Sequence, residues 1–306
     1  MGDLNAREEQ LEGERRKQSL NPNQRDVYDT IVDKINNQNP EDNTVFINAE
    51  AGTGKTYLLN AILSTVRGEG HVAFGLASTG VASVELKSGK TVHRQLKVPL
   101  NLDFSDYPTC AISRQSPLAS LIEQCRVILI DEATMLNNKA YGAIDRTFQD
   151  IMRNEHTFGG KVLVFAGDWQ QTLPVIPRAS RATIVGSTLK NAEFWQDVTQ
   201  LSLTMQMRLV EEVPGWRGFT SDIGRGVLPT VDFSQYTDFG FTIIAGEDKR
   251  TDFINSVFPN YRQGIGSDFP ERVILATNNE IVDKINNQIV LESPGKTRRF
   301  YLLYNY

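Results

Sequence analysis

The stretch Asn-Ala-Glu-Ala-Gly-Thr-Gly-Lys-Thr at residues 48–56 decides which fold this sequence can adopt. It follows a short run rich in β-branched residues, Thr44–Asn48, and it leads into an apolar-periodic segment from about Lys55 to Val66. This order predicts a strand, a glycine-bearing turn and a helix. Glycines let successive backbone N–H groups point at phosphate oxygens, and a helix N-terminus adds partial positive charge. The stretch therefore predicts a phosphate-binding loop (P-loop).

Each position of this loop has an expected task. Lys55 can reach the β- and γ-phosphates of a nucleotide, and the Thr56 hydroxyl can hold Mg²⁺. The predicted nucleotide-binding residues here are Ala51, Gly52, Thr53, Gly54, Lys55 and Thr56. The loop departs from the strict pattern at Ala49, where glycine is usual. The alternative is an ordinary glycine-rich turn at the start of a helix.

A pair of acids follows a second apolar run. Val127–Ile130 does not alternate with polar residues, as is typical of a strand buried on both faces of a parallel sheet. Asp131, at the end of that strand, can bind Mg²⁺ through a water molecule, and Glu132 can act as the general base for hydrolysis. The alternative is an acidic turn that caps a helix. Together with the P-loop, the pair predicts a Mg²⁺-dependent nucleoside triphosphatase.

A third buried run, Lys161–Ala166, ends in Gly167-Asp168 and is followed by polar side chains. Gln171 can sense the γ-phosphate or align the attacking water, as glutamines do in other P-loop enzymes. Such a turn is also common in ordinary α/β proteins. We predict that Gln171 couples the nucleotide to the rest of the protein.

Strands and helices alternate over the first two-thirds of the chain, which predicts an open parallel α/β sheet flanked by helices. Residues 1–19 are polar and densely charged, so we expect a mobile tail, or else a frayed helix. Residues 20–212 form the predicted first domain, with a proline-punctuated, loop-rich insertion at about 90–117. Pro214-Gly215 marks a boundary, and residues 213–306 are expected to form an incomplete second domain, with strands at Phe241–Ala245 and Arg272–Ala276 followed by helices.

The composition excludes several classes of protein. The 306 residues carry a net charge of −5, so any nucleic-acid contact has to come from a local groove. Two cysteines and three scattered histidines do not suggest a disulfide framework or a metal cluster. No apolar run approaches the roughly 20 residues that span a bilayer. The octapeptide Ile-Val-Asp-Lys-Ile-Asn-Asn-Gln occurs twice, at 31–38 and 281–288, which we interpret as two coincident helix segments and not as a repeat architecture.

The order of several motifs resembles that of the Pif-type DNA helicases of superfamily 1, and the branch found in Helitron transposons fits best. The motifs are AGTGKT, LASTGVAS, TVHRQLKVPL, ILIDEATML, VFAGDWQQTLPVIP, LTMQMRL and ILATNNEIVDKIN. They extend over about residues 20–290. The resemblance implies two RecA-like domains, of which the second is only partly present. It also implies an intracellular location, which is the nucleus if the source is eukaryotic, or else the mitochondrion.

The resemblance also implies roles for single residues. Gln24 would contact the adenine base, and Arg208 would reach the γ-phosphate from across an interdomain cleft and join Lys55, Glu132 and Gln171 in catalysis. Residues expected to contact single-stranded DNA are Ser78, Thr79, Gly80, His93 and Lys97, with Thr91 in the same motif. Trp169 and Trp216 are candidates for stacking on bases or for the protein core.

Two later motifs of the family, of the forms TxxKAQGxT and ALSR, do not occur in this sequence. The tail at 296–306 is basic and aromatic and is interpreted as a divergent or truncated end. By resemblance, we therefore expect the full-length protein to be an ATP-dependent helicase that moves 5′ to 3′ on single-stranded or forked DNA. We expect this 306-residue chain to bind ATP and Mg²⁺ but to unwind DNA poorly. The alternatives are a remnant that binds nucleotide or DNA without turnover and, with no motif to support it, a small-molecule kinase. The oligomeric state stays open.

Overall fold

The computed structural model describes residues 2–102, 105–207, 215–227, 249–264, 271–276 and 278–295. The chain forms two compact units, Met1–Val227 and Leu228–Tyr306. In the part of the chain that the structure describes, no helix is long and apolar enough to cross a membrane.

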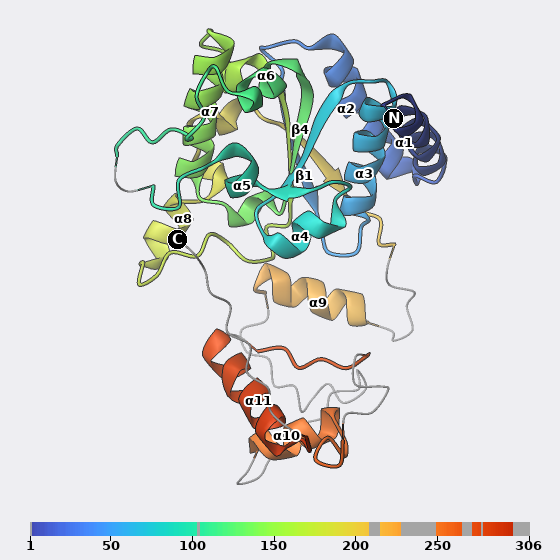
Figure 1. Ribbon diagram of the computed structural model, residues 1–306, viewed down its shortest axis with the longest axis vertical. Coiled ribbons are helices and arrows are strands. Elements are labelled where there is room, and N and C mark those ends of the chain that lie inside the picture. Colours follow the sequence, from blue (N-terminus) through green and yellow to red (C-terminus); the bar gives the residue numbers. More distant parts are fainter. Residues whose placement is uncertain are drawn as a thin grey trace. The chain divides into compact units, whose positions relative to one another are not determined.

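A parallel sheet lies at the centre of the first unit (Figure 1). Its strands are β1 (Thr44–Ala49), β2 (Val72–Ala77), β3 (Lys90–Thr91), β4 (Cys125–Asp131), β5 (Val162–Gly167) and β6 (Thr199–Leu203). Their order across the sheet is β3-β2-β4-β5-β1-β6, and every neighbouring pair is parallel. Parallel order brings all carboxyl ends to one edge, so the segments after β1, β2, β4 and β5 meet there.

Helices cover both faces of this sheet, which confirms the predicted α/β architecture (Figure 1). The helices of the unit are α1 (Gly2–Gln18), α2 (Pro22–Asn37), α3 (Lys55–Gly68), α4 (Gly80–Glu85), α5 (Val92–Leu96), α6 (Pro117–Gln124), α7 (Asn138–Met152), α8 (Arg181–Gly186) and α9 (Trp216–Arg225). Short 3-10 turns lie at Ala133–Met135, Thr157–Gly160, Leu189–Asn191 and Glu193–Asp197. Helices α2 and α3 lie on one face, and α6 and α7 on the other.

Two apolar clusters, one for each face, hold these layers together. In β5, Val162, Val164 and Ala166 belong to the cluster under α2 and α3. The intervening Leu163 and Phe165 belong to the cluster under α6 and α7. Successive strand residues point to opposite faces, so a strand covered on both sides needs apolar residues at every position. This explains why the buried runs of β4 and β5 lack a polar alternation.

Residues 2–18 form helix α1 instead of the mobile tail that the sequence predicted, and α1 packs against α3. Small residues permit the close approach, because a Cβ atom on Gly13 would lie 3.0 Å from the Thr65 backbone. Glu9 of this helix is deeply buried and forms an ion pair with Lys87 at 2.9 Å. The sequence did not predict an ordered helix here, because residues 2–18 are mostly polar and lack the apolar stripe of an amphipathic helix.

The predicted insertion is present between β3 and α6. Between α5 and α6 the described residues have no regular secondary structure. Residues 103 and 104 lie outside the described part. Val98 and Cys110 nevertheless reach the core cluster under α6 and α7. The insertion is therefore packed at points along its length.

The second unit contains α10 (Lys249–Val257) and α11 (Asn279–Glu292), which share a small apolar cluster. The strand predicted at Arg272–Ala276 is wrong: these residues have no regular structure, and Val273 and Leu275 are largely exposed. Apolar alternation needs a partner strand to become a strand, and the structure describes none beside this segment. The predicted strand at 241–245 and the tail at 296–306 lie outside the described residues.

Candidate active site

The P-loop connects β1 to α3 at the carboxyl edge of the sheet. Gly52 and Gly54 have φ angles of +87° and +79°, in the left-handed region that favours glycine. A Cβ atom at position 54 would also lie 2.4 Å from Nε2 of Gln24, so that side chain would have to shift. The loop is braced internally, since the Thr53 hydroxyl donates to the Glu50 carbonyl at 2.8 Å. The departure at Ala49 is accommodated because this residue is the last of β1 and is buried in the core.

Lys55, the first residue of α3, lies between the two predicted acids. Its Nζ is 2.9 Å from Oδ1 of Asp131 and 2.6 Å from Oε1 of Glu132. Burial alone would lower the pKa of the Lys55 ammonium, but the two carboxylates outweigh that effect and raise the pKa above its usual value. The structure thus brings Lys55 and Asp131 together at one corner of the sheet. The three side chains neutralise one another only partly, leaving one net negative charge.

The same corner offers oxygen atoms to a divalent cation. Asp131 is 2% exposed, and its Oδ2 lies 3.5 Å from the Thr56 hydroxyl. Its Oδ1 accepts the backbone N–H of Glu132 at 2.8 Å. The other carboxylate oxygen of Glu132, Oε2, is buried without a hydrogen-bond partner among the described residues. Carboxylate and hydroxyl oxygens suit Mg²⁺, so this donor set fits the predicted ion.

Glu132 is held by its backbone as well as by Lys55. It has φ 51° and ψ 38°, a left-handed conformation that costs a non-glycine residue free energy. A residue one position past a parallel strand would normally continue in an extended conformation. The turn instead lets Glu132 Oε1 meet the Lys55 ammonium.

Asp168 is a residue to which the sequence assigned no role, and the structure makes it the centre of a network after β5. Its Oδ2 accepts the backbone N–H of Ala51 at 3.1 Å and the side-chain amide of Gln171 at 3.0 Å. Its Oδ1 accepts the Gln170 N–H at 2.9 Å. The sequence feature that could have indicated a role for Asp168 is its place directly after a buried strand, in the pair Gly167-Asp168. Asp168 therefore links Gln171 to the P-loop.

Gln24 lies against the P-loop from the start of α2. Its side chain completes a capping box with Asn21, and its Nε2 donates to the Thr53 carbonyl at 2.9 Å. The segment after β6 reaches the same loop, because Gln206 donates to the Ala51 carbonyl and the Met207 N–H donates to the Gly52 carbonyl, both at 2.8 Å. Both backbone groups of Ala51 are thus bonded to protein groups. Neither Gln206 nor Met207 was singled out from the sequence.

The residues expected to contact DNA lie beyond β2 and β3 at the same edge. Thr79 and Thr91 cap α4 and α5 through their side-chain oxygens. Gly80 and Lys97 are exposed, and His93 is half-buried, which lowers its pKa. The hydroxyl oxygen of Ser78 is buried and has no hydrogen-bond partner among the described residues.

The remaining candidates are resolved only in part. Trp169 packs at a tilt against Phe46 and edge-on against Trp195, at centroid distances of 4.9 and 5.7 Å. Lys190 covers its ring, so Trp169 belongs to the core more than to an open stacking surface. Trp216 is half-buried beside Phe219 in α9. Arg208 lies outside the described residues.

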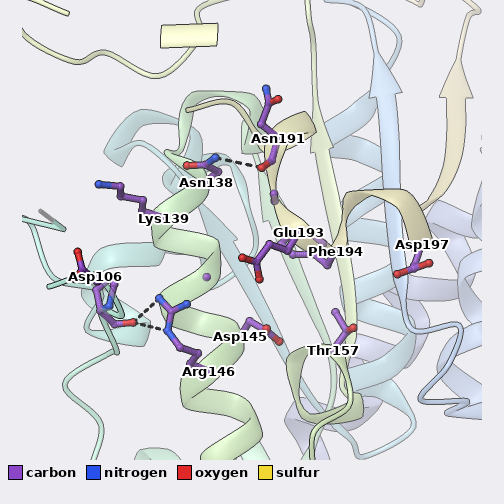
Figure 2. Close-up of a pocket in the computed structure, with 13 residues that line it drawn as sticks. Asp106, Asn138, Lys139, Asp145, Arg146, Thr157, Asn191, Glu193, Phe194 and Asp197 are labelled. Carbon is purple, nitrogen blue, oxygen red and sulfur yellow. Dashed lines mark hydrogen bonds between the residues drawn. The ribbon is translucent and has the colours of Figure 1, made fainter. Parts of the chain in front are cut away.

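A separate pocket of about 410 Å³ lies beside α7, away from the P-loop (Figure 2). Asp106 and Pro108 of the insertion border it, and Arg146 donates two hydrogen bonds to the Pro108 carbonyl. None of the predicted site residues lines it. The candidate site is therefore the P-loop corner and not this pocket.

Comparison with known proteins identifies the family. Residues 19–215 match the sequence model of the PIF1-like helicases. The ATP-dependent DNA helicase Pif1 of Psychrobacter is 30% identical over 131 residues, which cover 43% of this chain and 20% of the relative. RRM3 of Saccharomyces cerevisiae is 29% identical over 189 residues, covering 61% and 25%. Human PIF1 is 29% identical over 190 residues, covering 54% and 27%, so this chain spans a quarter or so of its curated relatives.

Solved structures agree on the fold. Pif1 helicase from Bacteroides, in complex with ADP-AlF3 and single-stranded DNA, superposes with a TM-score of 0.61 at 20% identity, covering 87% of this chain and 57% of that one. Pif1 helicase from Candida albicans gives 0.60 at 20% identity, covering 90% and 55%. Because the family match extends over well more than half of its 306 residues, the chain belongs to the PIF1-like helicase family.

Proposed function

We propose that this chain hydrolyses ATP to ADP and phosphate and couples that reaction to single-stranded DNA. The observation that carries the proposal is the placement of Lys55 against Asp131 and Glu132, directly after the P-loop. A lone glycine-rich turn would not need an ammonium group and two acids at one corner. The curated relatives are named ATP-dependent DNA helicases, which supports DNA as the polymer.

Each residue of the corner has a task in this reaction. ATP displaces Lys55 from the acids, and the ammonium group then stabilises charge that develops on the transferred phosphoryl oxygens. Glu132 takes a proton from the attacking water as general base. Gln171, held by Asp168, aligns that water or senses the γ-phosphate. Arg208 adds a second cation, and Gln24 contacts the adenine base.

Thr56 and Asp131 would hold Mg²⁺, which supplies charge neutralisation on the β- and γ-phosphates. The adjacent hydroxyl and carboxylate oxygens support this assignment. Thr79, Gly80, His93 and Lys97 are the proposed DNA-binding residues, whereas the Ser78 hydroxyl oxygen is buried and is not proposed to contact DNA. The Helitron branch, 5′-to-3′ movement and an intracellular, nuclear or mitochondrial location are part of the same proposal.

Phosphate release with and without a single-stranded oligonucleotide tests the proposal. We expect turnover that the oligonucleotide stimulates and that Lys55→Ala abolishes. Nucleotide or DNA binding without turnover in the wild type would support the non-motor alternative. A tailed duplex in the same assay measures unwinding, which we expect to be weak because the later family motifs do not occur in this sequence.

A further inference from the structure

The hydroxyl group of Ser78 is out of place for a residue expected to contact a DNA phosphate. Its Oγ is fully buried and has no hydrogen-bond partner among the described residues. A buried hydroxyl without a partner is costly, and native structures usually retain one only where it has a use. A phosphate of a polymer on the protein surface cannot reach an atom that is covered by protein.

The two residues that follow Ser78 begin helix α4. Thr79 accepts the backbone N–H of Ala82 at 3.2 Å and so caps α4. Gly80 is exposed, and a Cβ atom there would meet nothing within 4 Å. The segment therefore changes at Ser78 from a buried strand end to an exposed turn that is open to a ligand.

Ser78 also lies next to the catalytic acids. Ala77 and Asp131 are the last paired residues of β2 and β4, and the Ser78 N–H donates to the Asp131 carbonyl at 3.1 Å. Glu132 is the residue after Asp131, as Ser78 is the residue after Ala77. Glu132 Oε2 is a buried acceptor without a partner in the described structure, and Ser78 Oγ is a buried donor without one.

We propose that Ser78 is a positioning residue for Glu132, and not a DNA contact. When ATP draws Lys55 away, Glu132 loses the ion pair that holds its other oxygen, and the Ser78 hydroxyl then donates to Oε2, directly or through one water. That bond holds the carboxylate in an orientation turned away from the attacking water. Binding of a strand at Thr79 and Gly80 moves Ser78 and frees Glu132, so strand binding accelerates hydrolysis. This inference rests on the proposed function.

Ser78→Ala in the 306-residue chain tests the inference, with Ser78→Thr as the variant that keeps the hydroxyl. Phosphate release is measured over a range of oligonucleotide concentrations, and oligonucleotide affinity is measured separately by fluorescence anisotropy. We expect Ser78→Ala to raise the rate without DNA and to reduce the ratio of stimulated to basal turnover at least about threefold. The KM for ATP and the affinity for the oligonucleotide should stay unchanged, and Ser78→Thr should restore the ratio.

Thr79→Ala is the matched control, because Thr79 adjoins Ser78 but its side-chain oxygen caps α4 and so already has a partner. We expect it to weaken oligonucleotide affinity while the ratio at saturation is retained. If Ser78→Ala behaves in that way, or lowers both rates equally, the inference is overturned and Ser78 is a DNA contact or a structural residue. If the wild type shows no stimulated turnover, the proposed function fails and the inference fails with it.

Discussion

The polar residues after β1, β4 and β5 and those after β2 and β3 lie along one edge of the same sheet, but they are held in different ways. On the P-loop side, side chains hold one another across the sequence: Lys55 bonds to Glu132, and Asp168 bonds to Gln171 and to the Ala51 backbone. On the β2 and β3 side, the side chains of Thr79 and Thr91 accept hydrogen bonds within their own helix starts, and Lys97 is exposed.

This difference suits two kinds of ligand. A small, highly charged ligand is bound tightly only if its partners are already in place, because ordering each of them costs conformational entropy. A polymer is bound by many weak contacts, each of which is screened by salt. We therefore expect single substitutions to have large effects at the P-loop corner and small effects beyond β2 and β3.

Lys55→Ala should have the largest effect. It removes the cation that Asp131 and Glu132 share, and the phosphoryl group loses its main charge stabiliser. We expect turnover to fall by at least about 10²-fold, as for other groups that stabilise transition-state charge. Steady-state phosphate release measures it, and Lys97→Ala, another lysine at this edge, is the control. Residual activity above a tenth of wild type would contradict the proposed role.

Glu132→Gln should separate binding from chemistry. The amide keeps the shape of the side chain but cannot accept a proton, so turnover should fall by about 10²-fold or more. Binding of a fluorescent ATP analogue should remain. Loss of binding together with turnover would show that Glu132 has a structural role instead.

Asp168→Asn should have an intermediate effect on both stability and coupling. Three donors face the carboxylate, and an amide cannot accept from all of them, so at least one part-buried donor loses its acceptor. We expect a cost of about 1–3 kcal/mol in the free energy of unfolding. Thermal denaturation measures this, and Asp150→Asn, at an exposed site on α7, is the comparison.

Turnover should also report the loss of Asp168. Because Gln171 loses its anchor, we expect kcat to fall more than KM for ATP rises. Equal stability of Asp168→Asn and wild type would contradict the network.

Lys97→Ala should have a small effect that depends on salt. Its side chain is exposed, so one lost phosphate contact should weaken oligonucleotide affinity only a few-fold. The slope of log affinity against log salt should become shallower by about 0.7. Titrations at several salt concentrations check this slope, and an unchanged slope would remove Lys97 from the DNA-binding surface.

The smallest effect concerns His93. Burial lowers the pKa of this imidazole, so it is neutral at pH 7 and above and adds no charge to the surface. Between pH 7 and pH 8, the oligonucleotide affinities of wild type and His93→Gln should change in parallel. A loss of affinity that occurs only in the wild type over this range would show that His93 binds as a cation.

Most of the first unit could be predicted, because its strands and helices carry local signals. The apolar run of β4, the capping residue Ser116 before α6 and the proline at the start of α2 each act over a few residues. The edge strand β6 was not predicted, since its alternating burial resembles that of many exposed segments. Helix α1 was missed because its stability comes from packing against α3, which no local pattern reports.

The candidate site could be predicted as residue types but not as a bonded network. Lys55, Asp131 and Glu132 follow from spacing and strand ends. The bond from Lys55 to Glu132 and the bond from the Ala51 backbone to Asp168 join residues that are 77 and 117 positions apart in the chain. Sequence spacing carries no information about such distant hydrogen bonds.

The duplicated octapeptide allows one sequence to be compared in two different tertiary environments within the same molecule. The copy in α2 buries Ile31 and ends at Gln38 before Asn39-Pro40, whereas the copy in α11 leaves Ile281 39% exposed and continues through Gln288. Intrinsic helix propensity and side-chain chemistry are identical in the two copies. Any difference between their amide hydrogen-exchange rates therefore measures only what the surrounding protein adds.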